Sequence, residues 1–139
     1  MMTEERIMGI DYGSVRIGIA ISDPTKTLAT PLITLENNRK AVSTIRKLVE
    51  ERSVSTLVIG YPLNLKGQRG IAVDKVDEFI KRFRNCDLEI IRWDERFSTV
   101  SAMELLHQAG VKPYKDKARI DRSAAAVILQ EYLDFKKNN

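Results

Sequence analysis

Residues 16–22 (RIGIAIS) constrain the fold more than any other stretch, because large and small side chains alternate strictly along them. A period of two is that of a β-strand, here with a bulky face formed by Ile17, Ile19 and Ile21. An apolar run, residues 6–11, comes just before, and the turn sequence Tyr-Gly-Ser separates the two. The chain is therefore predicted to open with an antiparallel hairpin.

Further along, the hydrophobic pattern switches between strand and helix periods. A third strand is expected at residues 31–36, and a helix capped by Asn38 should follow. The later elements are expected to be a fully buried strand at residues 56–60, a helix at 73–83, a strand at 89–94, and helices beginning near Ser98 and near Asp121. This order predicts an α/β fold with a mixed five-stranded sheet, three antiparallel strands and then parallel ones, flanked by helices.

Composition indicates an ordinary folded protein, with 139 residues of which 43% are hydrophobic and 30% charged. We expect one domain over residues 1–139. The single cysteine, Cys86, excludes an internal disulfide and fits a reducing compartment. The polar start and the interruption of the first apolar run by Asp11 match neither a signal peptide nor a membrane span. A cytoplasmic protein without a membrane partner is predicted.

Acidic residues stand where ligands of such a sheet gather, at the carboxyl ends of strands. Asp11 closes the first strand, Asp94 and Glu95 close the fifth, and Asp121 stands at the expected start of the last helix. Any one of them alone is more simply explained as a cap or turn residue, and Asp121 as a helix N-cap. Clustered carboxylates on rigid elements are what a two-metal nuclease requires of its protein, with Mg²⁺ or Mn²⁺ as the ion. The chain has one histidine, His107, and one cysteine, which are too few to form a zinc site or a nucleophilic catalytic triad.

Basic residues are candidates for phosphate contacts, since the net charge is +4. The expected loop over residues 112–122 holds five cations, although a solvated loop is the alternative. The loop over residues 60–70 either binds phosphate or is a plain connection. The candidate nucleic-acid-binding residues are Arg16, Lys66, Arg69, Arg96, Lys112, Lys115, Lys117, Arg119 and Arg122.

Four stretches resemble the YqgF/RuvX family: GIDYGSVRIGIA at residues 9–20, VIGYPLN at 58–64, WDERFST at 93–99 and IDRSAAA at 120–126. The resemblance covers essentially the whole chain and implies a ribonuclease H-like fold related to RuvC-type Holliday-junction resolvases. It further implies a metal-dependent nuclease that processes the 5′ end of pre-16S rRNA in ribosome biogenesis, with Asp11, Glu95 and Asp121 as metal ligands. Asp94 is adjacent to Glu95, and consecutive strand residues point to opposite faces, so only one of the two should face the site.

Three alternatives stay open on the sequence. The first is a junction resolvase cutting four-way DNA, expected to act as a dimer, whereas a processing nuclease is expected as a monomer or homodimer. The second is an ATP-binding protein of the actin and sugar-kinase type, whose phosphate loop also reads Asp-x-Gly-Ser, but 139 residues are too few for its two-lobed cleft. The third is a non-catalytic RNA-binding ribosome-assembly factor. The partner in the first and third cases is branched DNA or structured RNA such as pre-rRNA.

Overall fold

A computed structural model describes residues 5–62, 70–94 and 117–138, with the backbone alone for residues 117–123. Its elements, in chain order, are β1 (Arg6–Tyr12), β2 (Arg16–Ser22), β3 (Ala29–Glu36), α1 (Ala41–Glu51), β4 (Val54–Tyr61), α2 (Ile71–Lys81), β5 (Glu89–Asp94) and α4 (Lys117–Lys137). In this part of the chain no helix is long and apolar enough to cross a membrane.

The strands form one mixed sheet with the order β3-β2-β1-β4-β5. β1 pairs antiparallel with β2, and β2 with β3. β4 pairs parallel with β1, and β5 with β4. The predicted sheet, three antiparallel strands followed by parallel ones, is confirmed. Parallel pairing also brings the carboxyl ends of β1, β4 and β5 to a single edge of the sheet, which we call the carboxyl edge.

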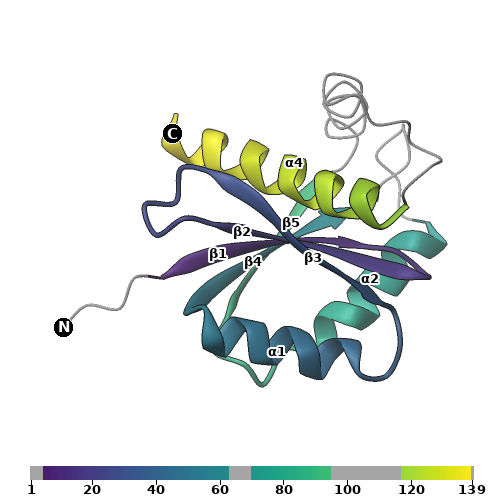
Figure 1. Ribbon diagram of the computed structural model, residues 1–139. Helices are drawn as coiled ribbons and strands as arrows, with labels where there is room; N and C mark the ends of the chain where they lie inside the picture. Colours follow the sequence, from purple (N-terminus) through teal and green to yellow (C-terminus); the bar gives the residue numbers. More distant parts are fainter. Residues whose placement is uncertain (1–4, 63–69, 95–116, 139) are drawn as a thin grey trace.

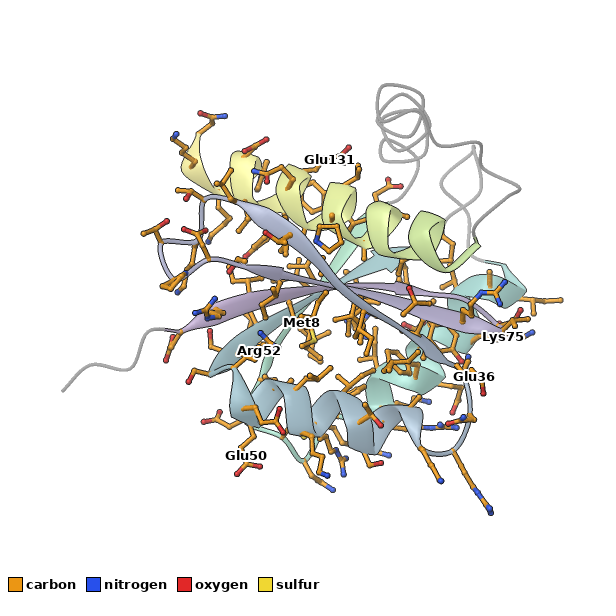
Figure 2. The ribbon with its side chains drawn as sticks, viewed as in Figure 1. Met8, Glu36, Glu50, Arg52, Lys75 and Glu131 are labelled. Carbon is orange, nitrogen blue, oxygen red and sulfur yellow. The ribbon has the colours of Figure 1, made fainter. Side chains whose placement is uncertain are left out.

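Helices cover both faces of the sheet, with α1 and α2 on one side and α4 on the other (Figure 1). Met8 and Ile10 of β1 belong to the core cluster shared with α1 and α2, and Figure 2 shows Met8 directed into that layer. Ile7 belongs to the second cluster, which is built on α4. The alternation in β2 is confirmed, because Ile17, Ile19 and Ile21 lie in the first cluster and Ala20 in the second.

Glycine at position 9 allows α4 to lie directly on β1. A Cβ at Gly9 would stand 2.7 Å from the Leu129 Cβ and 2.9 Å from the Ala125 carbonyl oxygen. Both atoms belong to the rigid part of the helix, so the contact has little room to adjust. Strand and helix therefore approach more closely here than a residue with a side chain permits.

Several predicted boundaries are wrong. α1 begins at Ala41 with Lys40 as its N-cap, and Asn38 instead accepts the Lys40 N–H at 2.9 Å in the preceding turn. β3 begins two residues before Pro31. α4 begins at Lys117, so Asp121 is inside the helix and is not its N-cap. The helix predicted near Ser98 lies outside the described residues.

Candidate functional site

Asp11 lies on the α4 face of the sheet, close to the carboxyl edge. Ile10 faces α1 and α2, and Gly9 faces α4, so alternation along β1 puts Asp11 on the α4 side. Its partner on β2 is Gly18, and on β4 the residue beyond the Ile10–Ile59 pair is Gly60. Neither neighbour has a side chain. The half-buried carboxylate thus stands on the central strand between two residues that have no side chain.

Asp94 lies on the opposite face of the sheet from Asp11. It pairs with Tyr61, which packs against the core cluster of α1 and α2. Two residues earlier, Arg92 binds Asp77 of α2, whereas Trp93 belongs to the α4 cluster. Glu95 itself lies outside the described residues, but the register removes Asp94 as its equivalent beside Asp11.

The first turns of α4 lie near Asp11. α4 runs antiparallel to β1, and its Ala125 and Leu129 sit over Gly9 (Figure 1). Asp121 precedes Ala125 by four residues, which is about one helical turn, or 6 Å, toward the carboxyl edge. Asp11 stands two strand residues beyond Gly9 in the same direction. The backbone therefore brings position 121 to the level of Asp11, while the Asp121 side chain lies outside the described residues.

One predicted nucleic-acid-binding residue can be placed fully. Arg16 begins β2, shares the α4 face with Gly18, and lies between the hairpin turn and Glu36 of β3. Lys117, Arg119 and Arg122 belong to α4, so the predicted loop over residues 112–122 is wrong from residue 117 onward. The backbone of these three is helical, and their side chains lie outside the described residues. The remaining predicted residues lie wholly outside the described part of the chain: Lys66, Arg69, Arg96, Lys112 and Lys115. His107 lies outside it as well.

A polar cluster that the sequence did not reveal joins α2 to the ends of β4 and β5. The Asp77 carboxylate accepts the Tyr61 hydroxyl at 2.9 Å and the Arg92 Nε–H at 3.2 Å. The Arg92 guanidinium also lies over the Tyr61 ring, 5.8 Å from its centre. A groove of about 590 Å³ opens beside them and is lined also by Asp74, Glu78 and Lys81. The period of β5 predicts that Arg92 shares the Tyr61 face, but not which helix residue it meets.

Trp93 occupies the α4 side of β5, level with Gly60. Its ring packs edge-on against Tyr132 at 5.8 Å and Phe135 at 5.7 Å. The indole N–H donates to Glu131 at 3.3 Å. Burial raises the pKa of the Tyr132 hydroxyl, and the nearby Glu89 carboxylate raises it further. These contacts make Trp93 part of the packing between β5 and α4.

The sequence predicts a site for a hard divalent ion at this edge. No group of three acidic, histidine or cysteine side chains that could hold a metal occurs among the residues whose side chains the structure describes. Two of the three predicted ligands lie outside that set, so the prediction is not tested there. Asp11, the third, offers carboxylate oxygen on a rigid strand, which is the ligand type that Mg²⁺ and Mn²⁺ prefer.

Comparison with known proteins gives the family and the fold. The family model RuvX, described as Holliday junction resolvase, matches residues 5–135. A proposed pre-16S rRNA nuclease of Ruminiclostridium cellulolyticum is 43% identical over 93% of this chain and 94% of its own length. A second protein of this name, from Chloroflexus aurantiacus, is 40% identical over 99% of this chain and 92% of its own length.

Among solved structures, T. thermophilus RuvC bound to a Holliday junction superposes with a TM-score of 0.60 at 10% identity, covering 96% of each chain. The fowlpox virus Holliday junction resolvase gives 0.58 at 15% identity, over 94% of this chain and 99% of that one. Identities this low show the fold alone, and with the sheet order they establish the ribonuclease H-like α/β fold. By the family match and the two relatives, this chain belongs to the RuvX (YqgF) family.

Proposed function

We propose that this protein is a cytoplasmic, metal-dependent nuclease that hydrolyses phosphodiester bonds, with the 5′ end of pre-16S rRNA as its substrate. The observation that carries the proposal is the position of Asp11, a carboxylate on the central strand at the carboxyl edge, in a chain whose relatives are named for pre-16S rRNA cleavage. We further propose that one domain, residues 1–139, performs the reaction as a monomer or homodimer.

In this proposal Asp11, Glu95 and Asp121 hold the ion. Asp11 lies on the α4 face, Glu95 follows the last residue of β5 in the chain, and position 121 lies in the first turns of α4. When bound, Mg²⁺ or Mn²⁺ lowers the pKa of the attacking water and stabilises the leaving oxygen. Glycines at positions 18 and 60 add no side chain beside Asp11, where the phosphodiester would bind.

Positive side chains bring the nucleic acid to this edge. Arg16 is placed to do so, because it lies on the Asp11 face near the hairpin turn. The other proposed phosphate contacts are Lys66, Arg69, Arg96, Lys112, Lys115, Lys117, Arg119 and Arg122. Phosphate contacts supply most non-specific affinity and position the substrate without reading its sequence.

A second candidate is resolution of four-way DNA junctions. It is favoured by the description of the matching family and by the two junction-resolving enzymes that share the fold. The same carboxylates serve either substrate. Symmetric cutting of a junction requires two active sites, so a dimer in solution favours this candidate over the first.

The test is cleavage of two labelled substrates by the purified protein with Mg²⁺ or Mn²⁺. One substrate is a ribosomal-RNA precursor fragment containing the 5′ end of 16S rRNA, and the other is a four-way DNA junction. Asp11→Asn is assayed in parallel to exclude a contaminating nuclease. Faster cleavage of the RNA supports the proposal, and faster cleavage of the junction favours the second candidate. If neither is cut while the protein binds RNA, the chain is an assembly factor and the proposal is wrong.

A further inference from the structure

We propose that the outer surface of α1 binds the phosphate backbone of the substrate RNA beyond the point of cleavage. This surface, which we call the α1 basic track, consists of Arg39, Lys40, Arg46 and Lys47. The inference rests on the proposed function for the identity of the nucleic acid, but not for the existence of the charged surface. None of the nucleic-acid-binding residues predicted from the sequence belongs to it.

The track gathers four positive side chains between two acidic flanks, Glu36 before it and Glu50 after it. All four side chains are exposed, and residues 37–49 contain no acidic residue. Arg39 and Lys40 each precede their counterparts, Arg46 and Lys47, by seven residues. Arg46 and Lys47 lie within α1, whereas Arg39 and Lys40 lie in the turn that leads into it, with Lys40 as the N-cap. Within the described part of the chain, none of the four takes part in an ion pair.

The charge order along α1 is the reverse of what helix stability favours. Basic residues stand at and just before the N-terminus, no acidic residue occupies the first turn, and no basic residue occupies the last. Glu50 and Glu51 instead end the helix. The helix dipole favours acidic residues at the start and basic ones at the end. The helix dipole therefore does not explain the basic residues at the start of α1, whereas binding of a polyanion does.

Hydrogen bonds connect the start of the track to the candidate active site. The Asn37 N–H donates to the Val15 carbonyl at 2.9 Å, and its side-chain amide donates to the Gly13 carbonyl at 2.8 Å. The segment that carries Arg39 and Lys40 is thus fixed to the β1–β2 turn. Arg16, which follows that turn, lies on the same face as Asp11. A nucleic-acid strand leaving Asp11 across the carboxyl edge meets these cations in order.

The far end of the track is extended by α2. The Arg46 guanidinium donates to the carbonyl of Arg82, the C-cap residue of α2. This contact holds the two helices together and places the exposed Arg82 beside Arg46, with Arg84 following. The nearest acidic residue on α2, Glu78, is already paired with Lys81 at 3.4 Å. The positive surface therefore continues from α1 onto the end of α2.

The test compares two double variants that each remove two positive charges from a helix surface. Arg46→Gln with Lys47→Gln neutralises the middle of the track. Lys136→Gln with Lys137→Gln neutralises the last turn of α4, on the opposite face of the sheet from α1 (Figure 1). Affinity for duplex RNA is measured by fluorescence anisotropy, without divalent metal so that no cleavage occurs, at several salt concentrations. One duplex has about 24 base pairs and the other about 8, which presents fewer phosphates to the protein.

The track variant is expected to bind the long duplex more weakly than the wild type, by about eightfold per lost phosphate contact at about 0.1 M salt. The slope of log affinity against log salt should fall by about 1–2, and affinity for the short duplex should fall by less than affinity for the long one. The α4 control should stay within about twofold on both duplexes, since its cations are far from the track. Arg46→Lys with Lys47→Arg keeps both charges and should bind as the wild type does.

Equal losses in the two double variants would overturn the proposal, because general charge would then explain binding. Wild-type affinity in the track variant would overturn it as well. Cleavage separates this result from the proposed function. If the wild type cuts the precursor and the track variant binds RNA as tightly as the wild type, the proposed function stands and the α1 basic track is refuted. If the wild type cuts neither substrate and the track variant binds the long RNA more weakly, the α1 basic track stands and the proposed function is refuted.

Discussion

Replacing Gly9 with alanine should destabilise the protein and move α4 away from the candidate site. The added methyl group would lie 2.7 Å from the Leu129 Cβ and 2.9 Å from the Ala125 carbonyl oxygen, well inside normal contact distance. Neither atom is the end of a flexible side chain. The helix must therefore shift from β1 by several tenths of an ångström, together with position 121.

Overpacking of a rigid contact costs about 1–3 kcal/mol. Alanine recovers about 0.4–1 kcal/mol because it restricts the unfolded chain more than glycine does. A net loss of about 1–2 kcal/mol in the free energy of unfolding is expected, which for a chain of this length lowers the Tm by about 3–7 °C. Activity should fall further than stability, since a shift of less than 1 Å in a catalytic constellation is costly.

Calorimetry gives the Tm, and precursor cleavage at 25 °C gives the rate. Gly70→Ala is the matched control, because a Cβ at Gly70 meets nothing within 4 Å and φ there is −137°. Its Tm should change little, since the gain in the unfolded state offsets a less favourable N-cap. An unchanged Tm in Gly9→Ala would refute the close packing of α4 on β1, and with it the placement of position 121 beside Asp11.

Two further predictions concern polar contacts. Asp77→Ala should lower the free energy of unfolding by about 1–2 kcal/mol in urea denaturation, because the Tyr61 hydroxyl and the half-exposed Arg92 lose their shared acceptor. When Tyr61→Phe is combined with Asp77→Ala, it should lower the free energy of unfolding by less than it does in the otherwise wild-type protein. If the two losses simply add, the two side chains are not coupled and the cluster is refuted. N–H groups of Leu28 and Thr27 and the Thr25 hydroxyl lower the pKa of Asp23 below its usual 3.8, the Leu28 bond most of all. Its contribution to stability is therefore present above pH 4 and lost as pH falls below it, so the Tm deficit of Asp23→Ala should shrink in acid; a constant deficit would contradict this.

Local patterns were enough to predict the sheet. The alternation over residues 16–22 and the unbroken apolar run near Val58 indicate a hairpin and a strand buried on both faces, and both are present. The start of α4 was placed too late, because a capping residue was sought at Asp121. Lys117, Ala118 and Arg119 favour helix strongly enough to begin it one turn earlier.

The candidate site was predictable by residue type and less so by geometry. The period of a strand shows only that neighbouring residues face opposite sides of the sheet. The pairing of Asp94 with Tyr61 shows that Asp94 lies on the α2 side. Likewise, the glycines beside Asp11 are set by the register of three strands, which distant parts of the chain determine together. The bond between Asp77 and Arg92 joins an α2 residue to a strand residue across the fold, and no local pattern specifies it.

The most direct test of the central claim is the single-turnover rate of precursor cleavage in two variants that remove one carboxylate each. Asp11→Asn removes the carboxylate on the α4 face, and Asp94→Asn removes the one on the α2 face of the same edge. Loss of several kcal/mol of charge stabilisation should slow Asp11→Asn about a thousandfold, with Asp94→Asn within about tenfold of the wild type. Equal loss in both variants, or a greater loss in Asp94→Asn, would contradict a site on the α4 face.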